Sequence, residues 1–184
     1  MDTALLLLRV VVGLLLIGHG TQKLFGWFGG YGLAGTGGFF HSVGFRPGKP
    51  MAALAGLGEA GGGLLLALGL LTPLAGAAIV GTLLVASSTH LDKGVWGANG
   101  GYELPLLYAV VGASIALAGP GAVSLDNAFG LTDNWSPALG GIAIAAGVVA
   151  AATVVARARL ALRADAQAAT ETAGQPDTSI GAAA

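Results

Sequence analysis

Long apolar runs, separated by short glycine-rich or charged stretches, make up most of this chain. Five such runs are each predicted to form a helix, at about residues 5–24, 51–71, 73–89, 104–118 and 138–156. Most of them approach the ~20 apolar residues that an α-helix needs to cross ~30 Å of hydrocarbon. The pattern therefore predicts an all-α fold, a polytopic membrane helical bundle.

The segments between these runs differ in character. Residues 25–50 are rich in glycine and aromatic side chains, and we expect an interfacial or re-entrant stretch, because irregular backbone at membrane depth needs protein or water around it. The second and third runs are separated only at Thr72-Pro73, which predicts a tight hairpin with Pro73 in the first turn of the next helix, where its missing N–H costs nothing. Residues 157–184 are predicted to form a disordered tail.

The basic residues gather on one side of the predicted membrane. Threading the chain back and forth places seven of its eight Lys and Arg residues on the same face: Lys23, Arg46, Lys49, Lys93, Arg157, Arg159 and Arg163. The opposite face receives Asp2, Asp126 and Asp133 and no Lys or Arg. By the positive-inside rule, the N-terminus is predicted outside and the C-terminal tail in the cytoplasm of a bacterial cell.

Composition narrows the function classes further. With 54% hydrophobic and 9% charged residues, the chain differs from soluble domains, in which roughly 25% of residues are charged. A net charge of −1 gives no basic surface for nucleic acid. The chain has no cysteine, so it forms no disulfide, thiolate metal site or covalent c-type haem.

Two charged residues, Arg9 and Glu59, fall well inside the predicted spans. Because a charge in hydrocarbon costs several kcal/mol by most estimates, each needs a partner or a function. Arg9 lies about 9 Å below the outer surface and Glu59 about 12 Å from the cytoplasmic one, at 1.5 Å per residue. Their long side chains could close the remaining gap, so we expect an Arg9–Glu59 ion pair that either fixes the helix register or organises a site.

Further polar residues cluster near the predicted cytoplasmic boundary. They are His19, Lys23, His90 and Glu103. His19 and Lys23 share a helical face because they are four residues apart, although Lys23 alone is more simply an anchor that reaches the interface. Together with Glu59, these groups are predicted to form a polar pocket that opens toward the cytoplasm.

Two cofactors are candidates for this pocket. His19 and His90 could ligate a b-type haem, but Lys23 and Glu103 would crowd it. A quinone is physically easier to place, since it needs a donor near each ring carbonyl, a carboxylate that exchanges protons and an apolar channel for its tail. His90 or Lys23 would donate, and Glu103 or Glu59 would relay protons. No metal site is predicted.

Several short motifs occur in order along the chain: Arg9 and Gly13, the stretch from Gly18 to Leu24, Gly58-Glu59, the hairpin from Gly69 to Pro73, His90, Gly101-Tyr102-Glu103 and the segment from Gly119 to Asp126. With these motifs the chain resembles the DoxX family of bacterial membrane proteins. The resemblance implies a four-helix unit over residues 1–126, to which residues 127–156 add an outer loop and a fifth transmembrane helix. The recurrent polar positions that it matches are Arg9, Lys23, Glu59, His90, Glu103 and Asp126. For Ser124 and Asp126, capping of a turn or short helix is the simpler interpretation.

The resemblance also implies a function, since some family members are subunits of a thiosulfate:quinone oxidoreductase. The leading hypothesis is therefore a quinone-associated redox or oxidative-stress role. Its predicted catalytic residues are Glu59, His90 and Glu103, and its predicted cofactor-binding residues are Arg9, His19 and Lys23. Two alternatives stay open: a carrier or binder of a small lipophilic or acidic molecule, and a non-catalytic membrane scaffold for redox partner proteins. Homo-oligomerisation is compatible with all three.

Overall fold

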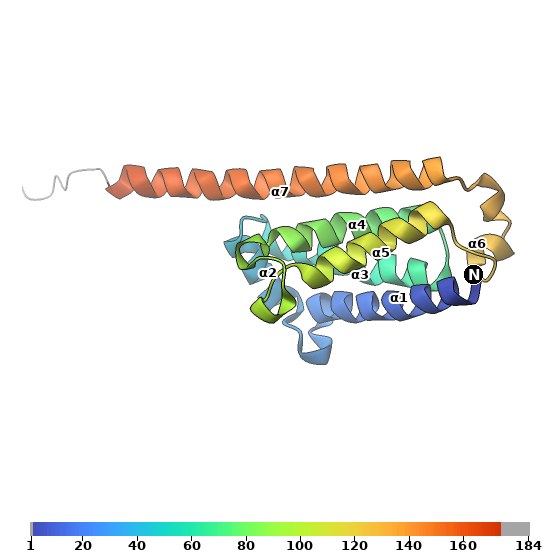
Figure 1. Ribbon diagram of the computed structural model, residues 1–184. Coiled ribbons are helices and arrows are strands. Elements are labelled where there is room, and N and C mark those ends of the chain that lie inside the picture. The colour runs from blue at the N-terminus through green and yellow to red at the C-terminus, as the bar shows by residue number, and fades with distance from the viewer. Residues whose placement is uncertain (1, 174–184) are drawn as a thin grey trace, which may run out of the picture.

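The structure, a computed structural model, describes residues 2–173 and is built from helices throughout (Figure 1). Five longer helices lie side by side: α1 (Asp2–Phe25), α3 (Gly48–Leu68), α4 (Thr72–Ser88), α5 (Glu103–Ala118) and α7 (Pro137–Ala173). Each corresponds to one of the five apolar runs, and the described residues contain no strand. The prediction of an all-α membrane bundle is confirmed.

Length separates these helices into two groups. By length and composition α1, α3 and α7 are each able to cross a membrane, whereas α4 and α5 are shorter apolar helices. With 17 and 16 residues, α4 and α5 rise about 25 Å, slightly less than the ~30 Å hydrocarbon layer. Since both run alongside the longer helices (Figure 1), they share the same bundle.

Four helices surround one apolar core. Its buried side chains come from α1, α3, α4 and α5: Val12, Leu16, Leu66, Ala75, Ile79, Leu83, Tyr108, Ala109 and Ile115. The fifth long helix, α7, packs on the outside of this unit against α4 and α5. The four-plus-one arrangement expected from the sequence is thus the arrangement of the helices.

Short helices occupy the connections between the long helices. We call the two ends of the bundle the α2 end and the α6 end, after the short helix that lies at each. At the α2 end lie η1 (Trp27–Gly29), α2 (Gly32–Ser42), η2 (Leu91–Lys93) and η3 (Gly97–Asn99); at the α6 end, near the N-terminus, lie α6 (Leu125–Ala128) and η4 (Leu131–Asn134). Because successive long helices alternate in direction, Lys23 and the 91–101 loop share the α2 end with α2, while Arg9 and the α3–α4 turn lie toward the α6 end. Pro73 is in the first turn of α4, as predicted.

The segment expected to be interfacial or re-entrant forms a small packed unit at the α2 end. Helix α2 packs against α3 and α1, and Phe40 and Phe45 are buried with Ala52 and Ala158 in a second apolar cluster. Other aromatic residues of the same segment, such as Trp27 and Tyr31, remain exposed. Exposed aromatic rings at the end of a membrane bundle suit the membrane–water interface.

Residues 157–173 differ from the disordered tail expected there. Helix α7 continues without a break to Ala173 and passes beyond the bundle at the α2 end (Figure 1). The stretch is rich in alanine, the strongest helix former, and it extends a helix that is already nucleated in the bundle. An ion pair between Arg46 and Asp165, with Arg46 Nη1 2.9 Å from Asp165 Oδ1, ties it to the loop after α2. The rest of the predicted tail, residues 174–184, lies outside the described residues.

Candidate functional site

Glycines set the register between α1 and α3, the two helices that carry the main polar residues. Gly13 packs on Gly63 and Gly20 on Gly56, so closely that a Cβ at Gly13 or Gly20 would lie 2.5 Å from the facing carbonyl oxygen. Small residues at such contacts let helix backbones approach closely within a membrane. Since α1 and α3 are antiparallel, this register places Glu59 at the level of Ile17.

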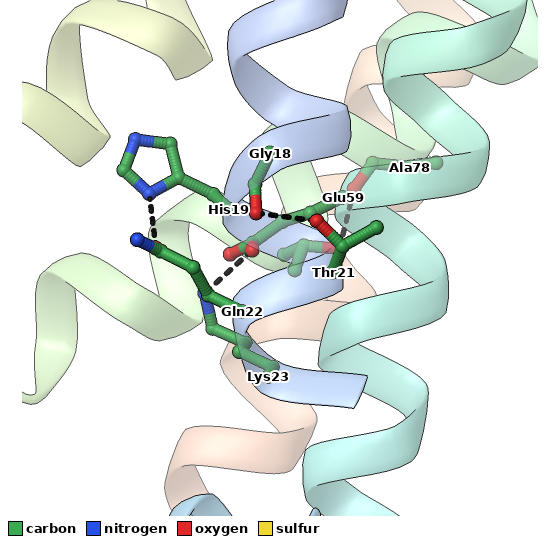
Figure 2. Close-up of polar contacts among 8 residues, drawn as sticks. Gly18, His19, Thr21, Gln22, Lys23, Glu59 and Ala78 are labelled. Atoms are coloured by element: carbon green, nitrogen blue, oxygen red, sulfur yellow. Dashed lines mark hydrogen bonds and ion pairs between the residues drawn. The ribbon is translucent and has the colours of Figure 1, made fainter. Parts of the chain in front are cut away.

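Glu59 forms an ion pair with Lys23 at the α2 end of the bundle (Figure 2). Lys23 Nζ lies 2.5 Å from Glu59 Oε2; the Glu59 side chain is 2% exposed and that of Lys23 is 23% exposed. Lys23 is therefore more than an interfacial anchor. It neutralises a buried carboxylate, and its own side chain remains partly exposed.

The prediction of an Arg9–Glu59 ion pair is wrong, because Glu59 pairs with Lys23. Arg9 lies eight residues from the level of Glu59, about 12 Å along α1, and Lys23 lies six residues away on the other side, about 9 Å. Side chains on a helix lean toward its N-terminus. Lys23 therefore leans toward the level of Glu59, whereas Arg9 leans away from it toward the α6 end.

Arg9 is instead buried at the α6 end, 1% exposed. Its guanidinium donates hydrogen bonds to the carbonyl oxygens of Pro120 and Val123, in the segment that follows α5. It also packs so closely on Gly69 in the α3–α4 turn that a Cβ at that glycine would lie 2.5 Å from Arg9 Nη1. Arg9 thus binds three parts of the chain together and lies far from His19 and Lys23, with which it was predicted to bind a cofactor.

Asp126 completes this α6-end cluster. Its carboxylate accepts hydrogen bonds from the backbone N–H groups of Leu71 and Thr72, at 2.7 and 2.9 Å, and from the Thr72 hydroxyl at 2.7 Å. It therefore caps the N-terminus of α4 from a distant part of the sequence, where a negative charge also suits the helix dipole. Ser124 caps α6 by accepting a hydrogen bond from the N–H of Asn127 at 3.1 Å. Both residues act as caps, as the simpler interpretation of the sequence predicted.

His19 lies on α1 beside the Lys23–Glu59 pair (Figure 2). Its Nδ1 is 3.2 Å from Oε1 of Gln22, and its ring meets the edge of Tyr108 on α5, with 5.8 Å between the ring centres. Sequence reasoning gave Gln22 and Tyr108 no role. The available signal for Tyr108 was a hydroxyl-bearing side chain within an otherwise apolar run.

His90 and Glu103 organise the loop between α4 and α5. His90 Nδ1 lies 2.9 Å from the carbonyl oxygen of Gly100, and Glu103 Oε2 accepts the N–H of Gly97 at 2.8 Å. Both residues lie at the α2 end, as expected from the sequence. Within residues 2–173, however, no hydrogen bond or ion pair joins either of them to Lys23, Glu59 or His19.

The predicted polar residues therefore divide into three groups with different chemical capacities. Arg9 and Asp126 are held mainly by backbone groups and hold the α6 end together, although Arg9 Nε is buried without a hydrogen-bond partner. His90 and Glu103 hold a loop. Lys23 and Glu59, with His19 beside them, contact each other through side chains at a partly accessible end. Of two cavities of about 250 and 240 Å³, the second is lined in part by Asp126, and neither is lined by Lys23, Glu59 or His19.

Comparison with known families adds one match. Residues 4–91 match the DoxX family model, a range that runs from the start of α1 to the residue after His90 and contains Arg9, Lys23 and Glu59. No curated protein and no solved structure matches the chain. The chain therefore carries a DoxX domain at residues 4–91, and the family resemblance seen in its sequence is confirmed there.

Proposed function

We propose that this DoxX-domain membrane protein takes part in quinone-linked redox chemistry, with the Lys23–Glu59 pair as the polar site that meets the quinone head group. The observation that carries the proposal is a carboxylate that is 2% exposed within a membrane bundle and paired with a lysine that is 23% exposed. Ionisable residues inside membrane helices are costly and usually serve proton or substrate pathways. Arg9 and Asp126 are accounted for as structural groups, which leaves this pair without an equivalent explanation.

The residues around the pair supply the required functional groups. A lysine ammonium group has three N–H donors, and Glu59 accepts one of them. The remaining donors of Lys23 are able to hold a ring carbonyl, His19 offers a second protonatable group nearby, and Glu59 is placed to hold a proton. A bound quinone would supply the two-electron redox chemistry, with electrons delivered by a partner protein. His90 and Glu103 would act by shaping the neighbouring loop.

The quinone content of the purified protein tests this proposal. We expect close to one quinone per chain after detergent purification, solvent extraction and mass spectrometry, and several-fold less in Glu59→Gln. The matched control is Glu171→Gln, the same substitution at an exposed residue of α7, which should retain the wild-type content. Quinone no higher than in an unrelated membrane protein, or equal amounts in Glu59→Gln and wild type, would contradict it.

A scaffold function is the second candidate, and the extension of α7 favours it. Beyond Ala158, which is still buried against Phe40 and Phe45, this helix passes the end of the bundle with exposed side chains that include Arg159, Leu160 and Arg163. Such a helix is available to a partner protein. Truncation after residue 158, which keeps the buried Ala158, should then abolish co-purification of redox partners but leave the quinone content unchanged, whereas Glu59→Gln should do the reverse.

We also propose that the α2 end faces the bacterial cytoplasm, because it carries seven of the eight basic residues. The absence of cysteine in the chain makes labelling of single introduced cysteines straightforward. Asn134→Cys at the α6 end should react with an impermeant maleimide in intact cells, and Asn99→Cys at the α2 end only after lysis. The opposite pattern would reverse the assignment.

A further inference from the structure

An apolar groove runs along the side of the bundle that lies between α3 and α7. Its floor is α4, its walls are α3 and α7, and Phe40 and Phe45 close it toward the α2 end. Many of its lining residues are small, among them Gly58, Ala78, Gly81, Gly147, Ala150 and Ala151. Leu54 on one wall and Ala150 on the other are exposed, so the groove opens sideways, where a bilayer would lie.

The size of the groove restricts what can occupy it. Its volume is about 250 Å³. One turn of an α-helix with side chains, about 10 Å wide and 5.4 Å long, occupies roughly 400 Å³. The groove is therefore too small to take up one turn of a helix from a second copy of this chain, whereas a hydrocarbon chain is much narrower and can place part of its length inside.

The lining of the groove excludes polar occupants. Thr82 is the only residue among those that line it with a polar side chain, and its hydroxyl donates to the carbonyl oxygen of Ala78 at 2.7 Å. A bound water needs two to four polar partners, which this surface does not offer. The groove also lies along helices that cross the membrane, so the surrounding solvent is hydrocarbon.

The charges beyond the α2 end of the groove indicate the head group of its occupant. Arg157 follows the lining residue Val154 by one turn of α7, and it is exposed. Arg46 adjoins Phe45 and is paired with Asp165, so these three charged residues together leave one positive charge. Basic residues at a membrane surface attract anionic lipid head groups.

The quinone proposed above would lie elsewhere. The Lys23–Glu59 pair faces α1, whereas the groove is formed by the side of α3 that faces α4. A quinone tail in the groove would therefore leave its ring without the donors of that pair.

We propose that this groove is a lipid-binding site that holds one acyl chain of an anionic phospholipid, with the phosphate close to Arg157 and Arg46. The site is separate from the proposed quinone site and does not depend on it. It would also fill the gap between the outer helix α7 and the DoxX domain, where side chains leave space.

Native mass spectrometry of the detergent-purified protein, with extraction and identification of the bound lipid, tests the proposal. The wild type should retain one phospholipid per chain after extensive washing. Ala150→Phe fills the groove and should lose that lipid, and Ala150→Leu should lose part of it. The matched control is Ala145→Phe, on the same helix and also exposed but outside the groove, which should retain the lipid with unchanged helix content.

A second pair of variants tests the head group. In nanodiscs of mixed lipid, Arg157→Gln should reduce the preference for anionic over zwitterionic phospholipid about fivefold, since one basic residue near the surface contributes about 1 kcal/mol. Arg163→Gln, farther along α7, should have a smaller effect. Equal lipid retention in Ala150→Phe and Ala145→Phe overturns the proposal, as does the recovery of quinone in place of phospholipid or a change of oligomeric state in Ala150→Phe alone.

Discussion

The two ends of the bundle bury charge in different ways. At the α6 end, Arg9 and Asp126 are 1% and 4% exposed, and their partners are mostly backbone groups of three separate segments. At the α2 end, Glu59 is equally buried, but its partner is the side chain of Lys23, which remains partly exposed. Backbone partners cannot move away without unfolding the turns that present them, whereas a lysine side chain can. The comparison indicates that the buried charges of the α6 end are held rigidly, whereas the partner of Glu59 at the α2 end is free to move.

Arg9→Met would test the rigid end most severely. It leaves the carbonyl oxygens of Pro120 and Val123 without their donor and Asp126 without a nearby positive charge. We expect a loss of about 3–5 kcal/mol in the free energy of unfolding, the usual effect of removing one partner from a buried ionic group. Unfolding in detergent, followed by circular dichroism, measures it. Arg159→Met at an exposed site of α7 is the control and should change stability by less than ~0.5 kcal/mol.

Lys23→Met and Glu59→Gln would separate the two partners at the α2 end. Lys23→Met leaves a buried carboxylate alone and should cost about 2 kcal/mol, since the group has to be neutralised or hydrated. Glu59→Gln should cost less, about 1 kcal/mol, because the freed lysine can reach the interface. Comparison of the two unfolding free energies is the measurement. Equal losses of unfolding free energy in the two variants would mean that Lys23 cannot move away when its partner is removed. That result would contradict the proposed contrast between the two ends.

Asp126→Ala would measure the cap on α4. The substitution removes the acceptor for two backbone N–H groups and one hydroxyl, and we expect a loss of about 2 kcal/mol, at the upper end of capping effects. Asp126→Asn keeps one oxygen acceptor and should cost less. Native-state hydrogen exchange should show the change first at the N–H groups of Leu71 and Thr72. Unaltered protection at these two amides in Asp126→Ala would argue against the cap.

The smallest effect is expected at the contact between Arg46 and Asp165. The hydrogen bond from Arg46 lowers the pKa of Asp165 below its ordinary value. The contact is therefore complete at neutral pH and is lost as the pH falls through that lowered pKa. Because both side chains are exposed, global stability should hardly change.

A spin label provides the measurement for this contact. Placed at Gln167→Cys on the extension of α7, it should become more mobile in acid, and Asp165→Asn should give the same mobility at neutral pH. Equal mobility of the label in all of these conditions would show that the contact between Arg46 and Asp165 does not restrain the extension, which would then be held only by the continuity of helix α7.

Local sequence patterns predicted the helices but not all of their partners. The five apolar runs predicted five helices, because an apolar run close to 20 residues long in a chain with so little charge is typical of a membrane-spanning helix. Ser124 and Asp126 were predicted as caps from residue type alone, yet the helix that Asp126 caps begins more than fifty residues earlier. The composition of residues 157–173 suggested disorder, whereas continuity with a buried helix favours α7. Tyr108 could be assigned beside His19 only once α5 was packed on the same core.

The sequence by itself determined which residues had to find partners, since a charge in an apolar run is costly wherever it lies. It also determined the all-α fold, the sidedness of the basic residues and the DoxX domain. Tertiary structure decided which partners those charges found. The glycine contacts between α1 and α3 set the relative height of the two helices, and the tilt of side chains toward each helix N-terminus brought Lys23 to Glu59 and turned Arg9 toward the opposite end. Residue types alone do not show a difference of two helical turns in the relative height of α1 and α3. That difference decides that Glu59 pairs with Lys23 and not with Arg9.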